Sequence, residues 1–264
     1  MIFALLPVKA PAQAKHRLSE LFTREEREKL ARSMFEEALG ALLAARGLDR
    51  VVVASSDAQI LRRAALLGAS AGPEPARERP GCTEPARGAG GRPPALCAGS
   101  MPGRPALVWP LSETIQNGHS SSADRAARKC MEWGATTLLM MPIDVPLVTA
   151  AEIEALLETA LALPAPRLVI VPSADGTGTN ALVRTPPDLV ESCFGPHSFR
   201  AHLEQARAKG AVVEVARPRG LVFDLDTPED LAQFLARAPS GPTAQLLRQM
   251  GAQERMSRAG GESE

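Results

Sequence analysis

The chain has 264 residues and carries 30 Lys and Arg against 30 Asp and Glu, so its formal net charge is zero. This balance argues against a partner recognised through a field of one sign, such as nucleic acid or an anionic membrane surface. No apolar run approaches the ~20 residues of a membrane-spanning helix. Aromatic residues make up only 3% of the chain and Tyr is absent, which argues against a platform for stacking bases.

The four cysteines, Cys82, Cys97, Cys130 and Cys193, show no metal-binding or redox spacing. The apolar start MIFALL has no basic segment before it, so we read it as a first strand and not as an export signal. We therefore expect reduced thiols in a cytoplasmic protein. The sequence leaves the oligomeric state open, with a homodimer among the options.

Strand and helix patterns alternate in the first part of the chain. Ile2–Leu6 is typical of a buried strand, and a capping box formed by Thr23 and Glu26 opens a helix that ends near Gly47. A second strand, Arg50–Ser55, precedes a second helix. This alternation predicts an α/β fold: a single Rossmann-like, three-layer α/β/α domain with a mostly parallel sheet.

Two segments depart from the pattern. Residues 72–105 are rich in Pro, Gly, Ala and Arg and show no periodicity, so we expect a disordered insertion within a domain that spans residues 1–238. Residues 239–264 form a polar C-terminal tail, in which we expect at most a weak, frayed helix around Leu246.

A carboxylate follows the most apolar strand of the second half. Thr137–Met141 predicts a strand buried on both faces, and Asp144 lies just beyond its carboxyl end, where open parallel sheets bind ligands. The next helix has its own capping box, Thr149 with Glu152, and does not need Asp144. Asp144 therefore serves a metal or catalytic role, or stabilises the turn.

The segment FDLDTPEDL holds two more carboxylates. We expect a strand at Leu221–Phe223, and beyond it Asp224 and Asp226 alternate along an extended segment, so that both point to one face. Thr227 caps the following helix, which leaves both carboxylates spare. Together with Asp144 they match the oxygen ligands of a hard cation such as Mg²⁺.

Three cations, Lys9, Lys15 and Arg17, follow the first strand. They predict either a clamp for nucleotide phosphates or a solvated basic loop. A second candidate contact is the group of serines at Ser120, Ser121 and Ser122. These residues open a helix, and either meet a nucleotide through backbone N–H groups or act as an ordinary cap.

Two polar turns lie further along the chain. PSADGTGTNALV contains Gly176, Gly178 and Asn180, and FGPHSFRAH contains Gly195 and Ser198 at the start of a helix. A glycine-rich turn alone is weak evidence. Two such turns, one at a helix N-terminus, predict a place where an anion can be held.

Five motifs in this order, LPVK…AKHRL, MPIDVPL, PSADGTGTNAL, FGPHSFRAH and FDLDTPEDL, resemble the guanylyltransferases of coenzyme F420 biosynthesis. These enzymes use 2-phospho-L-lactate, phosphoenolpyruvate or 3-phospho-D-glycerate and have the nucleotide-diphospho-sugar transferase fold. The resemblance implies transfer of GMP from GTP to a small phosphorylated carboxylic acid, with Mg²⁺ as cofactor and pyrophosphate as the second product.

The resemblance also implies roles for particular residues. The metal ligands are Asp144, Asp224 and Asp226. The acid-binding residues are Asn180, Gly195 and Ser198. The nucleotide-binding residues are Pro7, Lys9, Lys15 and Ser120, and the catalytic residues are Lys15, Arg17 and Asp144.

Two alternatives compete with this interpretation. A D-x-D motif at a strand end also serves metal-dependent glycosyltransferases of the same fold, which release a nucleoside diphosphate. The other alternative is a degenerate relative that binds nucleotide and has a regulatory role. Residues 72–105 and the turn Asn117–Ser120 depart from the family pattern in the nucleotide half, so the preference for guanine stays open.

Overall fold

The structure is a computed structural model that describes residues 1–9, 15–71, 107–112, 119–195, 197–237 and 239–261. The predicted insertion, residues 72–105, lies outside the described residues. The strands are β1 (Ile2–Val8), β2 (Arg50–Ser55), β3 (Leu107–Ser112), β4 (Thr137–Met140), β5 (Arg167–Pro172), β6 (Thr179–Thr185) and β7 (Val212–Val215). The long helices are α1 (Arg24–Ala44), α2 (Ala58–Ala71), α3 (His119–Glu132), α4 (Ala150–Ala162) and α5 (Ser198–Ala208). The shorter ones are η2 (His16–Leu18), α6 (Arg219–Val222), α7 (Pro228–Ala236), α8 (Pro242–Gln249) and α9 (Ala252–Gly261).

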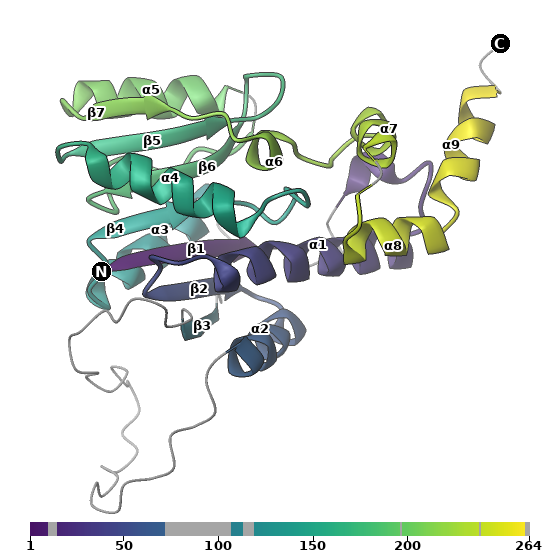
Figure 1. Cartoon of the computed structure of the whole chain (residues 1–264), viewed down its shortest axis with the longest axis horizontal. Coiled ribbons are helices and arrows are strands. Elements are labelled where there is room, and N and C mark those ends of the chain that lie inside the picture. The colour runs from purple at the N-terminus through teal and green to yellow at the C-terminus, as the bar shows by residue number, and fades with distance from the viewer. Residues whose placement is uncertain (10–14, 72–106, 113–118, 196, 238, 262–264) are drawn as a thin grey trace, which may run out of the picture.

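The strands form one seven-stranded sheet in the order β3-β2-β1-β4-β6-β5-β7 (Figure 1). All neighbouring pairs are parallel except β4 with β6 and β5 with β6, so β6 alone is reversed within this sheet. The predicted α/β fold with a mostly parallel sheet is confirmed. The sequence predicts that Asn180 lies in a turn, whereas in the structure it lies in β6, which pairs with β4 and β5.

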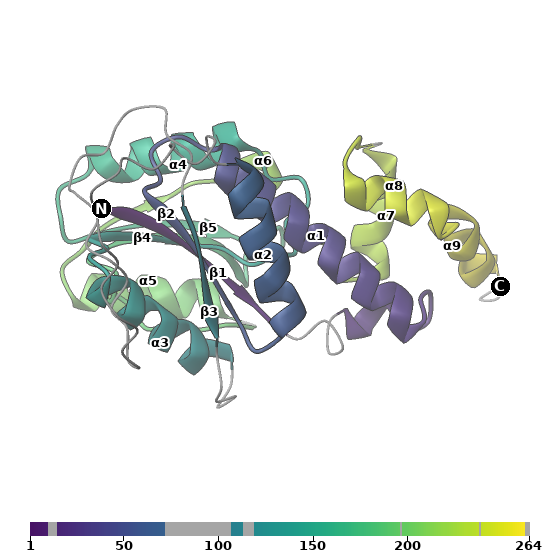
Figure 2. The same ribbon diagram turned by 90° about the horizontal axis from the view of Figure 1, so that it is seen from below.

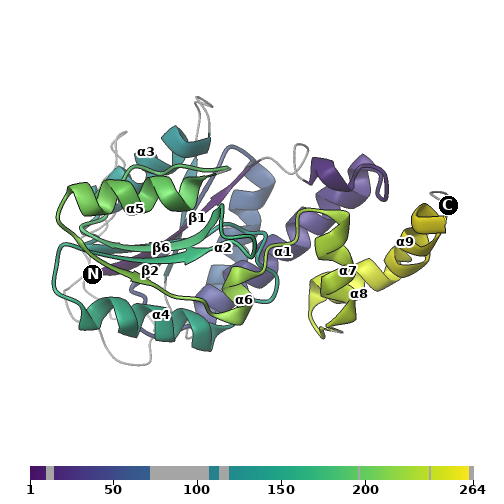
Figure 3. The ribbon, with the colours of Figure 1, turned by 90° about the horizontal axis from the view of Figure 1, so that it is seen from above.

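Helices cover both faces of the sheet, as the end-on views show (Figures 2 and 3). In β1, Ala4 and Leu6 pack into the core on the α1 and α4 side, whereas Phe3 and Leu5 pack into the core on the α3 side. All four are fully buried, which is what a continuous apolar run in a central strand predicts. No described helix is both long and apolar enough to cross a membrane.

The C-terminal residues build a third core, and the expectation of a frayed tail is wrong. Helices α7, α8 and α9 lie beside the far end of α1 (Figure 1). Ala244 and Leu247 of α8 are buried in one apolar cluster with Leu30 and Met34 of α1. Few apolar residues lie in this stretch, so its sequence alone reads as polar, and the helices are stabilised by the surface of α1 that they cover.

Helix α6 corrects a second expectation, because the predicted strand at Leu221–Phe223 is a helical turn up to Val222. The turn packs so closely that a Cβ on Gly220 would clash with the carbonyl oxygen of Leu147. The N–H of Gly220 donates to the Glu152 carboxylate at 2.7 Å. This close packing sets residues 224–226 beside the loop after β4, where Leu225 N–H donates to the Asp144 carbonyl at 2.9 Å.

Candidate active site

Four predicted site residues meet at the carboxyl edge of the sheet. The Lys15 ammonium lies 3.1 Å from Oδ2 of Asp144 and 3.5 Å from Oδ1 of Asp226. Arg17 Nη1 lies 3.2 Å from Oδ2 of Asp226. The Lys15 side chain is 4% exposed, whereas the two carboxylates are about one-third exposed and Arg17 is largely in solvent. We call these four residues the Lys15 cluster.

The backbone fixes where the Lys15 ammonium sits. Lys15 has φ 54° and ψ 41°, a left-handed conformation that costs a residue with a side chain roughly 1 kcal/mol or more. The turn η2 follows at once, and Leu18 N–H donates to the Lys15 carbonyl at 3.0 Å. Leu18 is fully buried in the third core, so the turn is anchored to α1 and to the C-terminal helices.

Asp224 has different surroundings from Asp226, two residues away. The Asn180 amide nitrogen donates to Oδ1 of Asp224 at 3.3 Å and to the carbonyls of Leu221 and Val222 at 3.0 Å each. Burial raises the pKa of Asp224, the hydrogen bond from Asn180 opposes that rise, and the charge of Asp144 adds to it. Asn180 therefore braces α6 against β6, beside a carboxylate whose charge is disfavoured by burial.

The carboxylates fit a divalent cation only in part. Among the described residues, no group of three or more His, Cys, Asp or Glu lies close enough together to hold a metal ion. Asp144 and Asp226 do converge on one positive charge, the Lys15 ammonium. Mg²⁺ usually takes only one or two protein carboxylates and completes its shell with substrate phosphates and water. The pair therefore suits a cation that arrives with phosphate.

The second polar turn begins α5. His197 has φ 66°, Gly195 has φ 100°, and Ser198 N–H donates to the Gly195 carbonyl at 3.2 Å. The Ser198 hydroxyl is buried and donates to Oγ1 of Thr179 at 3.3 Å. Because β6 is reversed, its first residues lie at the carboxyl edge of the parallel strands. Ser198, Gly195 and Asn180 thus gather at the same edge as the Lys15 cluster.

His202 belongs to this network, although no sequence pattern indicates its role beyond its place one turn after Ser198. His202 is fully buried, its Nε2 accepts the N–H of Cys193 at 3.0 Å, and its Nδ1 lies 3.1 Å from Oγ1 of Thr179. The first contact assigns the proton to Nδ1. Burial, helped by the positive charge of Arg184, lowers the pKa of His202 to about 4, so the ring is neutral at pH 7.

This arrangement leaves one hydrogen available for a ligand. Thr179 Oγ1 accepts hydrogen bonds from Ser198 and from His202. A hydroxyl has two lone pairs and one hydrogen, so both lone pairs are used and the Thr179 hydrogen is left to donate elsewhere. The turn at Ser198 and the start of β6 therefore offer one hydroxyl donor beside the N-terminus of α5.

The residues predicted to bind nucleotide lie along the same edge. Pro7 is buried near the end of β1, and Lys9 is exposed just beyond it. Ser120 lies in the first turn of α3, where its hydroxyl accepts the N–H of Phe194 at 3.3 Å. This contact joins the start of α3 to the segment that leads into the Gly195–Ser198 turn.

Comparison with known proteins assigns the family. A family model described as "Guanylyl transferase CofC like" matches residues 2–71 and 111–262. Phosphoenolpyruvate guanylyltransferases of Sphaerobacter thermophilus and Rubrobacter xylanophilus are each 34% identical, over 91% and 89% of this chain and 96% and 94% of theirs. A 2-phospho-L-lactate guanylyltransferase of Methanobrevibacter ruminantium is 25% identical over 95% of this chain and 92% of its own.

The fold also resembles that of a solved structure. A crystal structure described as a nucleotide-diphospho-sugar transferase from Desulfovibrio desulfuricans G20 superposes with a TM-score of 0.65 at 16% identity and covers 97% of both chains. This similarity confirms the predicted type of fold. The family model covers well over half of the chain and every predicted motif. The chain belongs to the family of CofC-like guanylyl transferases.

Proposed function

We propose that the protein transfers GMP from GTP to the phosphate oxygen of a small phosphorylated carboxylic acid and releases pyrophosphate. Family membership supports this activity, which the resemblance to known families assigns to coenzyme F420 biosynthesis. The observation that carries the proposal is the buried Lys15 ammonium between Asp144 and Asp226, at the edge that also holds the Ser198 turn. We propose phosphoenolpyruvate as the acid, because two relatives that share 34% of their residues with this chain bear that name.

The chemistry needs charge and position more than proton transfer. The attacking phosphate oxygen is already an anion, so a general base is dispensable. Lys15 and Arg17 supply positive charge where the α-phosphate becomes crowded with oxygens, and the fixed backbone of Lys15 holds its ammonium before substrate arrives. Mg²⁺, when bound at Asp144 and Asp226, would neutralise further phosphate charge.

The acid fits the other half of the edge. The positive end of a helix dipole favours an anion, and α5 starts at Ser198, although the N–H groups of Ser198 and Phe199 already donate to the carbonyls of Gly195 and Thr177. The Thr179 hydroxyl adds one donor. An acid held here would have one anionic group at the start of α5 and its phosphate directed toward the Lys15 cluster. GTP would lie over the carboxyl end of β1 and the start of α3, near Lys9 and Ser120.

A product assay tests the proposal. Purified protein is mixed with Mg²⁺, one of the four NTPs and one of the three candidate acids, and pyrophosphate and the coupled product are measured. We expect pyrophosphate only when GTP and an acid are both present, with phosphoenolpyruvate giving the highest rate. Lys15→Met, which keeps the length of the side chain and removes its charge, serves as the inactive control.

Other outcomes would identify the competing functions. Release of a nucleoside diphosphate from a sugar nucleotide would identify a glycosyltransferase. Binding of GTP without turnover of any acid would favour a regulatory protein. Equal rates with all four NTPs would remove the preference for guanine and leave the transfer chemistry standing.

A further inference from the structure

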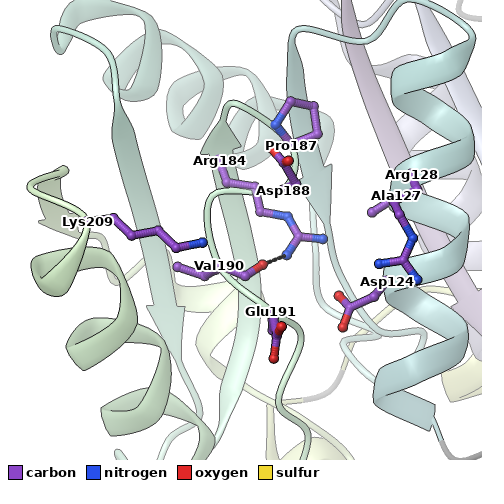
Figure 4. A pocket seen from close by; sticks show the side chains of 9 residues that line it. All are labelled: Asp124, Ala127, Arg128, Arg184, Pro187, Asp188, Val190, Glu191 and Lys209. Carbon is purple, nitrogen blue, oxygen red and sulfur yellow. Dashed lines mark hydrogen bonds between the residues drawn. The ribbon is translucent and has the colours of Figure 1, made fainter.

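A pocket of about 230 Å³ opens on the α3 side of the sheet. It lies between α3 and the segment that follows β6, and Arg184 lies at its base (Figure 4). Arg184 pairs with Leu138, near the start of β4. Because β6 is reversed, this position is near the amino ends of the parallel strands, whereas Asp144 follows the carboxyl end of β4.

Arg184 is the unusual member of this pocket. It is fully buried, and its Nη1 donates to the Val190 carbonyl at 2.6 Å. Its Nε and Nη2 find no hydrogen-bond partner within the described part of the chain. In Figure 4 the guanidinium points from β6 toward α3, with Nη2 directed toward the side of Asp124 and Ala127.

The two unpartnered nitrogens indicate the kind of group that the pocket suits. Nε and Nη2 lie on one edge of the guanidinium, where their N–H groups are parallel and match both oxygens of a carboxylate. Buried donors are rarely left unpaired in folded proteins. The Nε and Nη2 edge of the Arg184 guanidinium is therefore suited to bind a carboxylate.

The charges around the pocket restrict the ligand further. Three cationic and three anionic side chains line it: Arg128, Arg184 and Lys209, and Asp124, Asp188 and Glu191. A phosphate or a polyanion gains little net attraction from such a balanced set. A ligand with one carboxylate and one ammonium group finds partners for both. The volume is below the ~300–1,000 Å³ of pockets that bind drug-sized molecules, so the ligand is small.

We propose that this pocket binds a small zwitterion, an α-amino acid. Its carboxylate lies against Nε and Nη2 of Arg184. Its ammonium group faces Asp188 and Glu191, which are exposed at the rim and line the pocket. Oδ1 of Asp124 is already engaged by the N–H of Ser192 at 2.9 Å, so the rim carboxylates are the better partners for the ammonium.

The segment after β6 links this pocket to the active site. It contributes Val190 to the pocket, gives the N–H of Cys193 to His202, and then enters the Gly195–Ser198 turn. The pocket and the acid site thus share one continuous segment, so the amino acid should change the KM for the phospho-acid, a consequence that rests on the proposed function.

Calorimetric titration tests the binding site without any assay of activity. The probes are glycine, L-alanine and L-glutamate, with acetate and inorganic phosphate for comparison. We expect at least one amino acid to bind once per chain, at least tenfold more tightly than acetate or phosphate. Arg184→Lys keeps the charge but loses the paired donors, and should weaken that binding roughly ten- to a hundredfold.

Because Arg184 is buried, a loss of binding in Arg184→Lys can also arise from misfolding, so a second variant is made at an exposed residue. Asp188→Asn removes a rim carboxylate and should weaken the amino acid several-fold while leaving acetate unchanged. Arg207→Ala is the matched control, because Arg207 is an exposed cation of α5 that does not line the pocket. It should bind as the unmodified protein does.

Three results would overturn the site: no binding of any of the three amino acids, tighter binding of phosphate, or unchanged binding in both Arg184→Lys and Asp188→Asn. The kinetic arm is separate. Binding together with an unchanged KM for the acid would refute the link to the active site. Binding by a protein that turns over no acid would refute the proposed function and leave the site standing.

Discussion

Two ion-pair clusters that involve residues near the start of the chain differ in the geometry with which their charged groups meet. In the clamp between Glu26 and Arg255, two guanidinium nitrogens meet the two carboxylate oxygens at 2.8 and 2.7 Å. Arg255 also donates to the Leu21 carbonyl at 3.0 Å. In the Lys15 cluster, one ammonium is shared between two carboxylates at 3.1 and 3.5 Å, and Arg17 meets Asp226 through one nitrogen at 3.2 Å. The clamp has paired geometry and the Lys15 cluster does not.

The difference separates an interaction that stabilises from one that can change partners. Hydrogen bonds from Arg255, above all, lower the pKa of Glu26 to about 2, so this carboxylate is strongly favoured as an anion. Burial instead raises the pKa of Asp224 beside the active site. Asp144 and Asp226 contact Lys15 and Arg17 through single nitrogen–oxygen contacts without the paired geometry of the clamp. Breaking the clamp should therefore reduce stability, and breaking the cluster should reduce turnover.

The largest expected effect comes from the cluster itself. Asp144→Asn and Asp226→Asn should each lower turnover by about a hundredfold or more, because each removes a charge that holds the cation and orders Lys15. Melting temperatures should stay close to that of the unmodified protein, since both residues are partly exposed. Turnover at saturating GTP, acid and Mg²⁺ is the measurement. Normal turnover in either variant would remove that residue from the reaction.

Ser198→Ala tests the acid side of the edge. The Ser198 hydroxyl donates to Thr179 and so leaves the Thr179 hydrogen for the acid. Its loss should weaken that hydrogen bond to the acid, and a hydrogen bond to an anion is worth roughly 1.5–3 kcal/mol. The KM for the acid should rise about ten- to a hundredfold, and the KM for GTP should stay nearly constant. An equal change in both constants would mean that the turn shapes the whole edge. A change for GTP alone would mean that the two halves are assigned the wrong way round.

The clamp should give a smaller effect, on stability alone. Arg255→Met should lower the free energy of unfolding by about 1 kcal/mol, because both partners keep some contact with solvent. The pKa of Glu26 is depressed in the folded state, so the clamp stabilises fully above the ordinary value near 4.5 and loses its effect as pH falls toward 2. Urea unfolding at pH 7 and pH 3 measures this. A variant equally destabilised at both values would show that packing, and not charge, matters here.

Asp224→Asn should give the smallest change, and with the opposite sign. A carboxylate whose pKa is raised on folding binds its proton more readily in the folded state, so its ionised form lowers stability at neutral pH. Replacement by Asn should raise the melting temperature slightly at pH 7 and reduce turnover. The gain should shrink as pH falls and the native Asp224 takes up its proton. A lower melting temperature at pH 7 would contradict this reading.

Features set by neighbouring residues were predictable from the sequence. The capping boxes at Thr23 and Thr149, the cap at Thr227 and the bounds of β2 follow from short patterns, and all are confirmed. The grouping of Lys15 with Asp144 and Asp226 was reached only through family resemblance, since these residues lie 129 and 211 positions apart. The Mg²⁺ site and the residues assigned to GTP stay predictions.

Features set by distant partners could not be predicted. Strand β6 has polar residues at its start and is a strand because β4 and β5 flank it. Helix α6 depends on Glu152 and Asn180, which satisfy its backbone groups from other elements. His202 has no metal or catalytic spacing in the sequence, and its role follows from contacts with Cys193 and Thr179.

The third core has a consequence for how the chain folds during synthesis. Its apolar surface on α1, including Leu30 and Met34, is covered by α8, and the Thr243 hydroxyl donates to Ser33 across 210 positions. A ribosome that adds about 5–20 residues per second needs roughly 10–40 s to make that interval. During this time α1 is complete but one of its apolar faces is bare. Nascent chains of this protein should therefore engage chaperones through α1 until α8 has been made.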